Sequence, residues 1–353
     1  MMPVDIVGGL ADSAFMSTDD ARSAWNRCRH DPARTAGHYE SYFQRANHPD
    51  RPLGFWIRYT LFSPEGRPRD AVGELWAIWF DGERGTVTAV KSVVPFGHCR
   101  FDRTCLSVQI GEARLNEARL SGGAASTGHA IAWDLEYGGD EPPLLLLPEN
   151  LYERAFPAAK ALVGTPGAQY RGTISVDGEV FAIDDWVGSQ NHNWGRRHTD
   201  RYAWAQVAGF DGAPGSFLEC STAQVKLGPL WSPRFTLVVL RVDGEEYALN
   251  TLAQGLRASG RWTGSGLGFD WSLRSRQGPV EITAQISAPR ERFVGLRYQN
   301  PPGGVKTCLN TKLARVELTL KRAGRADVQL RCAQRAAFEI LTDDGSHGVP
   351  IVA

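Results

Sequence analysis

The chain of 353 residues carries 39 basic side chains (Lys and Arg) and 39 acidic ones, so its formal net charge is zero. This balance excludes the broad basic surface of a typical nucleic-acid-binding protein, and no nucleic-acid partner is expected. Hydrophobic residues make up 42% of the sequence and charged residues 22%, which is typical of a chain that folds around a core. At roughly 150 residues per domain, the length predicts about two domains.

The cysteine pattern and the N-terminal residues are typical of a cytoplasmic protein. The six cysteines, at positions 28, 99, 105, 220, 308 and 332, include no CxxC pair, and we expect free thiols. The first 16 residues lack both a basic segment and an apolar run of signal-peptide length. The longest aliphatic run, Leu144 to Leu147, is far shorter than the ~20 residues of a membrane-spanning helix. The sequence predicts a cytoplasmic location and leaves peripheral membrane contact open.

Helix signals occur at two places. Ser17 and Asp20 have the spacing of a capping box, which predicts a short helix from Ala21 to Arg27. Further along, Pro157 precedes an alanine-rich segment and Gly164 follows it, as at the two ends of a short helix. We expect this second helix in the connection between two domains.

The rest of the chain has the alternation and composition of short β-strands. Strands are expected at 55–62, 74–80, 86–94, 107–110, 130–137, 170–176, 180–186, 202–210, 216–225, 235–242, 246–249, 269–273, 280–287, 294–298, 315–321 and 327–332. Asp-Gly pairs at 81–82, 177–178 and 243–244 predict hairpin turns. This pattern predicts an all-β protein built from barrels or sandwiches. The strand pattern is interrupted between residues 140 and 167, which predicts a boundary between two domains (35–164 and 165–353). Residues 1–34, with the predicted helix, are expected to form an N-terminal extension.

Motifs for common cofactors are absent from the sequence. There is no GxGxxG, GxxxxGK[ST], HExxH or GxSxG, so dinucleotide, P-loop, zinc-protease and α/β-hydrolase sites lose their main support. In the second half, His192 and His198 are close together but have no HxH or CxxC companion. The sequence therefore predicts no cofactor and no metal.

One segment, from Trp186 to His198, concentrates polar side chains, and two interpretations of it stay open. As a surface loop between strands, it would use Asn, Ser and Gly as ordinary turn residues. As the end of a strand, it would place His192 and Trp194 on one face, because residues two apart in a strand share a face. The second interpretation sets a proton-handling group beside an electron-rich ring.

A carboxylate interrupts the apolar run from Phe217 to Cys220. If Phe217 and Glu219 point inward, burial would raise the pKa of Glu219 and keep a proton available at neutral pH. The alternative is a Glu219 that faces solvent or pairs with an arginine.

A charged residue, Arg58, lies in the middle of an aromatic-rich strand. It could bind the polar head of a ligand, or it could pack over a tryptophan or face solvent. Glu40 and Glu74 lie in other aromatic-rich segments and are candidates for buried ion pairs with Arg58.

The run Asn191-His192-Asn193-Trp194-Gly195 and the following strand Tyr202-Ala203-Trp204 resemble the double-lipocalin superfamily. This superfamily contains the carotenoid 1,2-hydratases (hydroxyneurosporene synthases), tocopherol cyclase-like proteins and AttH-like proteins. Segments 39–43, 55–59 and 73–76 are similar to its opening strands, and the resemblance covers most of residues 35–340. It implies two consecutive lipocalin-like antiparallel β-barrels that hold a hydrophobic ligand without a redox cofactor.

The resemblance also implies a function and a set of site residues. Known members hydrate or cyclise polyene and prenyl chains, and the hydratases use a His and a Trp at the spacing of His192 and Trp194. Phe217 and Glu219 stand where the hydratases have Tyr and Asp. The implied catalytic residues are His192, Glu219 and Trp194, and the implied substrate-binding residues are Asn191, Asn193, Tyr202, Trp204, Phe217, Arg58 and Trp56.

Protonation of a C=C bond forms a carbocation, which requires a strong acid and aromatic faces in a water-poor pocket. We therefore expect a cofactor-independent lyase or isomerase, of the hydratase or cyclase type, that acts on an isoprenoid or another hydrophobic polyene. The alternative is a non-catalytic lipid or isoprenoid carrier of the same fold. The sequence leaves the choice between enzyme and carrier open.

Overall fold

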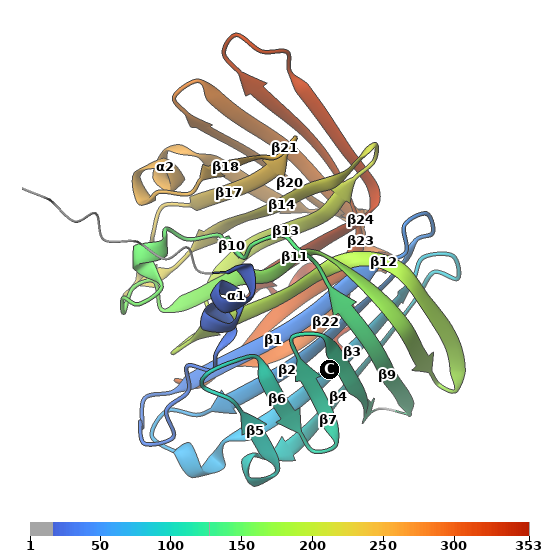
Figure 1. Ribbon diagram of the computed structural model, residues 1–353. Helices are drawn as coiled ribbons and strands as arrows, with labels where there is room; N and C mark the ends of the chain where they lie inside the picture. The colour runs from blue at the N-terminus through green and yellow to red at the C-terminus, as the bar shows by residue number, and fades with distance from the viewer. Residues whose placement is uncertain (1–16, 127, 353) are drawn as a thin grey trace, which may run out of the picture.

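Two antiparallel sheets dominate the computed structural model, which describes residues 17–126 and 128–352 (Figure 1). Within these residues the first sheet has 12 strands, with the main order β4-β3-β2-β1-β12-β11-β9-β8-β7-β6-β5 and β10 paired to β11. The second has 10, with the main order β18-β17-β14-β13-β24-β23-β21-β20-β19 and β22 paired to β23. The predicted all-β fold is confirmed.

The first sheet curls into a nearly closed barrel. Its strands are β1 (His38–Asn47), β2 (Leu53–Ser63), β3 (Val72–Asp81), β4 (Thr86–Pro95), β5 (Cys99–Phe101), β6 (Ser107–Ile110), β7 (Ala113–Asn116), β8 (Arg119–Ser126), β9 (His129–Gly138), β10 (Leu144–Leu145), β11 (Ala159–Val176) and β12 (Glu179–Gly195). β4 lies against β8 and β9, which closes most of the circumference. Aromatic side chains such as Phe55, Tyr59, Trp79 and Trp186 fill the interior.

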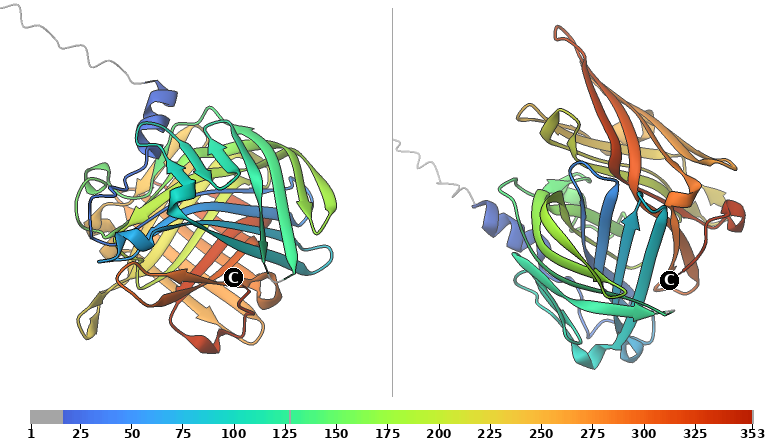
Figure 2. Two further views of the ribbon diagram at one scale, coloured as in Figure 1. Left: turned by 90° about the horizontal axis from the view of Figure 1, so that it is seen from below. Right: turned by 90° about the vertical axis from the view of Figure 1, so that its right-hand side faces the viewer.

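The second sheet packs across the first and extends beyond it at the β20–β21 and β23–β24 hairpins (Figures 1 and 2). Its strands are β13 (Arg201–Phe210), β14 (Ala213–Gln224), β17 (Phe235–Val242), β18 (Glu245–Leu249), β19 (Ser259–Gly264), β20 (Gly268–Gln277), β21 (Val280–Pro289), β22 (Val294–Gln299), β23 (Val305–Arg322) and β24 (Val328–Thr342). β15 (Lys226–Leu227) and β16 (Leu230–Trp231) form a separate small hairpin. Apolar residues such as Leu218, Val238, Trp271 and Phe338 form the core inside the curve of this sheet.

The predicted N-terminal helix is confirmed as α1 (Thr18–Asn26), with the side chain of Ser17 accepting a hydrogen bond from the backbone N–H of Asp20. A second α-helix, α2 (Leu252–Arg257), follows β18, and short 3₁₀ helices span Pro68–Asp70, Phe96–His98, Glu149–Leu151, Arg290–Arg292 and Gly345–His347. In the described part of the chain, no helix has the length and apolar character that crossing a membrane requires.

The helix predicted before Gly164 is wrong, because these residues begin the long strand β11. Pairing with β12 overrides the local helix propensity of the alanine-rich segment. Gly164 is needed for another reason. An added Cβ would lie 2.0 Å from Oε1 of Gln190 and 2.5 Å from Nδ2 of Asn26, so the glycine makes room for the contact between α1 and β12.

Hairpins form at all three predicted places, and at two of them the Asp-Gly pair itself makes the turn. Asp177 and Gly178 have φ angles of 51° and 89°, and Asp243 and Gly244 have 55° and 74°. Positive φ at both central residues is the signature of the tight turn that matches strand twist. Asp81 ends β3, and Thr86 pairs with it to begin β4. All six cysteines are free, as expected.

The change of sheet does not coincide with the predicted division between residues 164 and 165. Both β11 and β12 belong to the first sheet, where β12 pairs with β1 along its polar half. The second sheet begins with β13 at Arg201. His192 therefore lies in the first sheet, and not in the second domain where the sequence division places it.

The glycine at position 188 allows β12 to approach β1 closely. An ideal Cβ on Gly188 would lie 1.8 Å from the backbone carbonyl oxygen of Arg45, and the neighbouring strand cannot yield without breaking its pairing. We expect Gly188→Ala to lower the free energy of unfolding by about 3 kcal/mol or more, measured by urea denaturation. Gly138→Ala, at the open end of β9, is the matched control, because no atom lies within 4 Å of its added Cβ. Equal effects of the two substitutions would contradict this explanation.

Candidate functional site

The polar segment after Trp186 is a buried strand and not a surface loop. Residues from Ser189 to His192 in β12 are all buried, and they pair with β1 on one side and β11 on the other. Successive side chains of a strand point to opposite faces. His192 and Trp194 accordingly share the inner face of the first sheet, with ring centroids 4.5 Å apart, as the strand interpretation predicts.

On this inner face, His192 is held between α1 and β1. Its Nε2 lies 2.8 Å from Oε1 of Glu40, and its Nδ1 lies 3.0 Å from the backbone oxygen of Trp25 in α1. The ring stacks on Tyr42, with the centroids 4.3 Å apart. Burial lowers the pKa of His192, and the hydrogen bond to Glu40 opposes this. Because both ring nitrogens face oxygen acceptors, neither is free to bind a ligand.

Glu40 is the centre of a larger group of hydrogen bonds. Its carboxylate accepts from the backbone N–H groups of Arg29 and His30, from Sγ of Cys28, from the hydroxyl of Tyr42, and from Nε2 of His38 and His192. Burial alone would raise the pKa of Glu40, but the hydrogen bonds from the two histidines outweigh burial and hold it far below its usual value. Glu40 is therefore a buried carboxylate anion that ties residues 28–30 to β1.

The opposite face of β12 contacts the second sheet through Gln206 of β13. The side-chain oxygen of Gln206 accepts from Nε of Arg45 (2.8 Å) and from the hydroxyl of Ser189 (2.6 Å). Its amide nitrogen donates to Oδ1 of Asn191 (2.8 Å) and to Oε2 of Glu219 (2.9 Å). Gln206 thus uses its full hydrogen-bonding capacity to join the two sheets.

Glu219 of β14 is buried in this interface between the sheets. Besides Gln206, its carboxyl group accepts a hydrogen bond of 2.7 Å from Nε1 of Trp204. Burial raises the pKa of Glu219 to about 7, and the two hydrogen bonds only partly oppose the shift. Glu219 thus points inward, which is one of the two alternatives that the sequence left open, and with a pKa of about 7 part of the protein carries the protonated acid at neutral pH.

The structure separates the predicted catalytic residues. His192 and Trp194 face the inside of the first barrel, whereas Glu219 lies in the interface on the other side of β12. His192 and Glu219 share no hydrogen-bonding partner among the described residues. The alternation of side chains along β12 that puts His192 and Trp194 on one face puts Asn191 on the other, where it shares Gln206 with Glu219 as hydrogen-bonding partner.

The remaining predicted residues lie along the same interface. Phe217 packs with Leu144, Leu146, Leu237 and Val239, beside Glu219. Farther along, Phe43 lies between Trp204 and Trp56, with both ring centroids 6.1 Å from its own. The ammonium group of Lys312 is 5.7 Å from the ring centroids of Trp56 and of Trp204. The hydroxyl of Tyr202 lies 3.9 Å from Sγ of Cys308, and Oδ1 of Asn193 is buried with no hydrogen-bonding partner among residues 17–126 and 128–352.

Arg58 packs against aromatic rings, in agreement with the second interpretation of this residue. Its guanidinium carbon lies 4.5 Å from the ring centroid of Tyr298, and Nη2 donates to the hydroxyl of Ser41 at 2.6 Å. The suggested ion pairs with Glu40 and Glu74 are wrong. Glu40 is occupied by histidines and backbone N–H groups. Glu74 pairs with Lys91 at 2.7 Å, because the two are diagonal neighbours in the paired strands β3 and β4.

Sequence reasoning missed several members of this interface, above all Gln206 and Arg45. It also missed the buried ion pair in which Nζ of Lys312 lies 2.9 Å from Oε1 of Glu339. The signal for Gln206 was present, because it is a polar residue in an otherwise apolar strand, as Glu219 is. Arg45 and Lys312 carry no such local mark. Across residues 17–126 and 128–352, no cluster of three or more His, Cys, Asp or Glu side chains is arranged to hold a metal ion.

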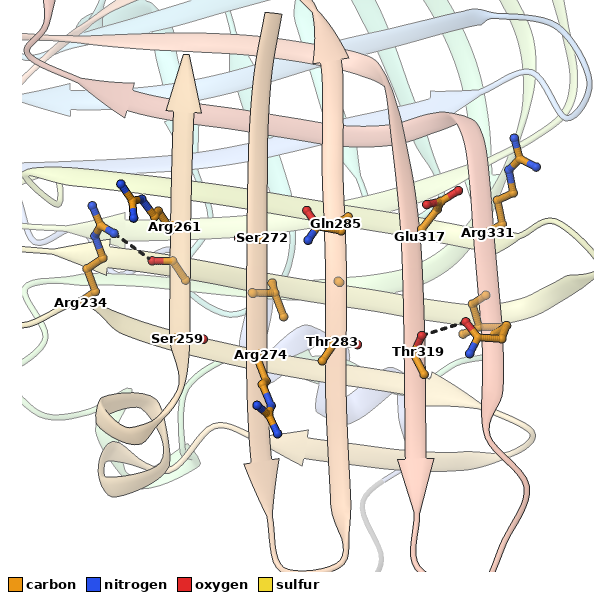
Figure 3. Close-up of a pocket in the computed structure, with 15 residues that line it drawn as sticks. Arg234, Ser259, Arg261, Ser272, Arg274, Thr283, Gln285, Glu317, Thr319 and Arg331 are labelled. Atoms are coloured by element: carbon orange, nitrogen blue, oxygen red, sulfur yellow. Dashed lines mark hydrogen bonds between the residues drawn. The ribbon is translucent and has the colours of Figure 1, made fainter. Parts of the chain in front are cut away.

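A cavity of about 1000 Å³ lies elsewhere, against strands β19, β20, β21, β23 and β24 of the second sheet (Figure 3). It is lined mainly by polar side chains, among them Arg234, Arg261, Gln285 and Arg331. None of the predicted site residues lines it.

Comparison with known proteins places the chain in a family. The tocopherol cyclase-like family matches residues 157–340, slightly more than half of the chain. Two uncharacterized proteins of Mycobacterium tuberculosis, MT0513 of strain CDC 1551 / Oshkosh and Rv0493c of strain H37Rv, are each 28% identical to it over 314 residues. The match covers 84% of this chain and 87% of each relative.

Solved structures support the fold at low sequence identity. A putative AttH protein from Nitrosomonas europaea superposes with a TM-score of 0.55 at 17% identity, covering 97% of this chain and 99% of that one. Kievitone hydratase from Nectria haematococca superposes with a TM-score of 0.51 at 13% identity, covering 87% and 89%. The superfamily that the sequence resembles is therefore the correct one, and the chain belongs to the tocopherol cyclase-like family.

Proposed function

We propose that this protein is a cofactor-independent hydratase or cyclase that protonates a C=C bond of an isoprenoid or another hydrophobic polyene, with Glu219 as the acid. The observation that carries the proposal is the environment of Glu219: its carboxyl group is buried beside Trp204, and burial raises its pKa to about 7. The family description, and the name of kievitone hydratase among proteins of this fold, agree with this type of chemistry.

In the proposed reaction, the carboxyl proton of Glu219 passes to one alkene carbon, and the π electrons form the new C–H bond. The other carbon becomes a carbocation, which the faces of aromatic rings stabilise best where water is scarce. Trp204 and Phe43 supply such rings near Glu219. Attack by water and return of its proton to the Glu219 carboxylate gives a hydrated product, whereas attack by a nucleophile within the substrate gives a ring.

The proposal assigns different roles to the two buried glutamates. Burial raises the pKa of Glu219 to about 7 although two neutral side chains donate to it, while the pKa of Glu40, which is surrounded by donors, is held far below its usual value. When one carboxyl pKa is raised and another is lowered, the first group commonly acts as the acid and the second as the anion. In this scheme His192 is a positioning residue for α1, because both of its ring nitrogens are occupied.

Deuterium transfer tests the proposal directly. We would incubate the protein in D₂O with a panel of linear isoprenoids and prenylated phenols, and examine the products by chromatography and mass spectrometry. The expected result is a product with deuterium bound to carbon, absent with heat-denatured protein. A compound that stays bound to the protein but is recovered unlabelled and unchanged would favour the carrier and contradict the enzyme.

A further inference from the structure

The small hairpin β15–β16 stands apart from both large sheets. It connects β14, which carries Glu219, to β17, and it projects from the body of the protein (Figure 2). Gly228, with φ of 64°, and Pro229 form its two-residue turn, a combination typical of tight hairpins. Its base is held firmly, since Ser232 exchanges hydrogen bonds with Val225 and the backbone N–H of Lys226 donates to Asp200.

The tip of this hairpin presents two leucines to the outside. Leu227 and Leu230 are direct cross-strand partners, so their side chains lie side by side on one face. They are 60% and 69% exposed. Adjacent exposed leucines on a rigid, projecting turn are costly in water, and such apolar surface commonly marks an interaction site.

Basic side chains flank the strands of this hairpin. The guanidinium carbon of Arg201 lies 4.2 Å from the ring centroid of Trp231, and the ammonium group of Lys226 lies 5.3 Å from it. Arg234, an exposed residue, follows three residues later, where the chain leaves the hairpin. Its side chain is directed at β19, with Nη1 donating to the backbone oxygen of Gly260, and Figure 3 shows it beside Arg261. In the described part of the chain, Arg201, Lys226 and Arg234 form no ion pair with any carboxylate within 4.0 Å.

We propose that the β15–β16 hairpin docks on an anionic lipid bilayer, with Leu227 and Leu230 inserted below the headgroups. A tryptophan with flanking lysine and arginine is the combination that prefers the membrane interface, where its ring is half-buried and the cations meet lipid phosphates. Apolar insertion and attraction to anionic lipid reinforce each other in peripheral binding. The unpaired cations favour a negatively charged surface over a second copy of this chain, whose matching hairpin would present the same charges.

The inference goes beyond the proposed catalysis and does not depend on it, because its test measures binding alone. We would sediment the full chain with vesicles of phosphatidylcholine, and with vesicles containing equal parts of phosphatidylcholine and phosphatidylglycerol. Binding is expected to the second kind and to weaken as salt is added. The double substitution Leu227→Ser/Leu230→Ser should weaken binding by roughly tenfold or more. Lys226→Gln and Arg234→Gln should each weaken it by roughly fivefold.

Leu267→Ser is the matched control, since Leu267 is 86% exposed in the turn between β19 and β20. It should bind vesicles as the unchanged protein does. Any one of three results would overturn the proposal: no binding to anionic vesicles, unchanged binding of the leucine double variant, or a loss of binding in Leu267→Ser equal to that of the double variant. If light scattering finds a dimer that the double variant abolishes, while vesicles are not bound, the face belongs to a second copy instead. Should the double variant fail to fold, the two charge variants and the salt dependence decide the question.

Discussion

Glu219→Gln is expected to reduce turnover by roughly 10²- to 10⁴-fold, the usual contribution of a positioned general acid, while ligand affinity changes little. The substitution keeps the size of the side chain and removes the transferable proton. It leaves one acceptor oxygen in place of the two that bind Trp204 and Gln206. The measurement is kcat and, separately, ligand binding, with the compound that takes up deuterium. Glu219→Asp is the matched control, because it keeps a carboxylic acid in the same interface and should retain part of the activity.

The pH dependence of the same reaction has a definite sign. The active form of Glu219 carries its proton, so kcat should be highest below its pKa of about 7 and fall as the pH rises through that value. An ordinary exposed glutamate would already be ionised there, since its pKa is near 4.5. A Glu219→Gln protein that turns over normally, or a kcat that rises with pH across this range, would refute the assignment.

Glu40→Ala is expected to lower the free energy of unfolding by about 3–5 kcal/mol, because each buried donor left without an acceptor costs about 1–3 kcal/mol. The change leaves His192, His38 and the backbone N–H groups of Arg29 and His30 without their acceptor, in a region where His192 and His30 are buried. Urea denaturation measures the effect. Glu83→Ala is the control, because the exposed pair of Glu83 with Arg51 should contribute no more than about 1 kcal/mol.

Acid should diminish the contribution of Glu40. Its pKa is depressed in the folded protein, so its stabilisation is complete above the usual carboxyl pKa of 4.5 and is lost progressively as the pH falls below it. The difference in unfolding free energy between the unchanged protein and Glu40→Ala should therefore be smaller in acid than at neutral pH. A difference that grows on acidification would mean that Glu40 is not held as an anion.

These predictions concern two glutamates that the sequence marked very unequally. Glu219 interrupts an apolar strand, and this local contrast was enough to name burial with a raised pKa as one of two alternatives. Glu40 drew attention only as a candidate partner of Arg58, because its main partner, His192, is 152 residues away along the chain. The membership of Trp25 in the same group could not be foreseen, since it depends on where α1 rests against the barrel.

The sequence by itself determined the local features of this protein: the capped helix α1, the Asp-Gly hairpins, the alternating strands, and the shared face of His192 and Trp194. Each depends on residues only a few positions apart, through backbone angles, capping and the strand period of two. Tertiary structure alone decided that β11 and β12 join the first sheet, and that Glu219 lies across β12 from His192. The burial, the pKa and the ion-pair partners of a side chain depend on which faces of the sheets pack together. That packing is made by contacts between segments far apart in the sequence, so no short stretch of sequence can determine it.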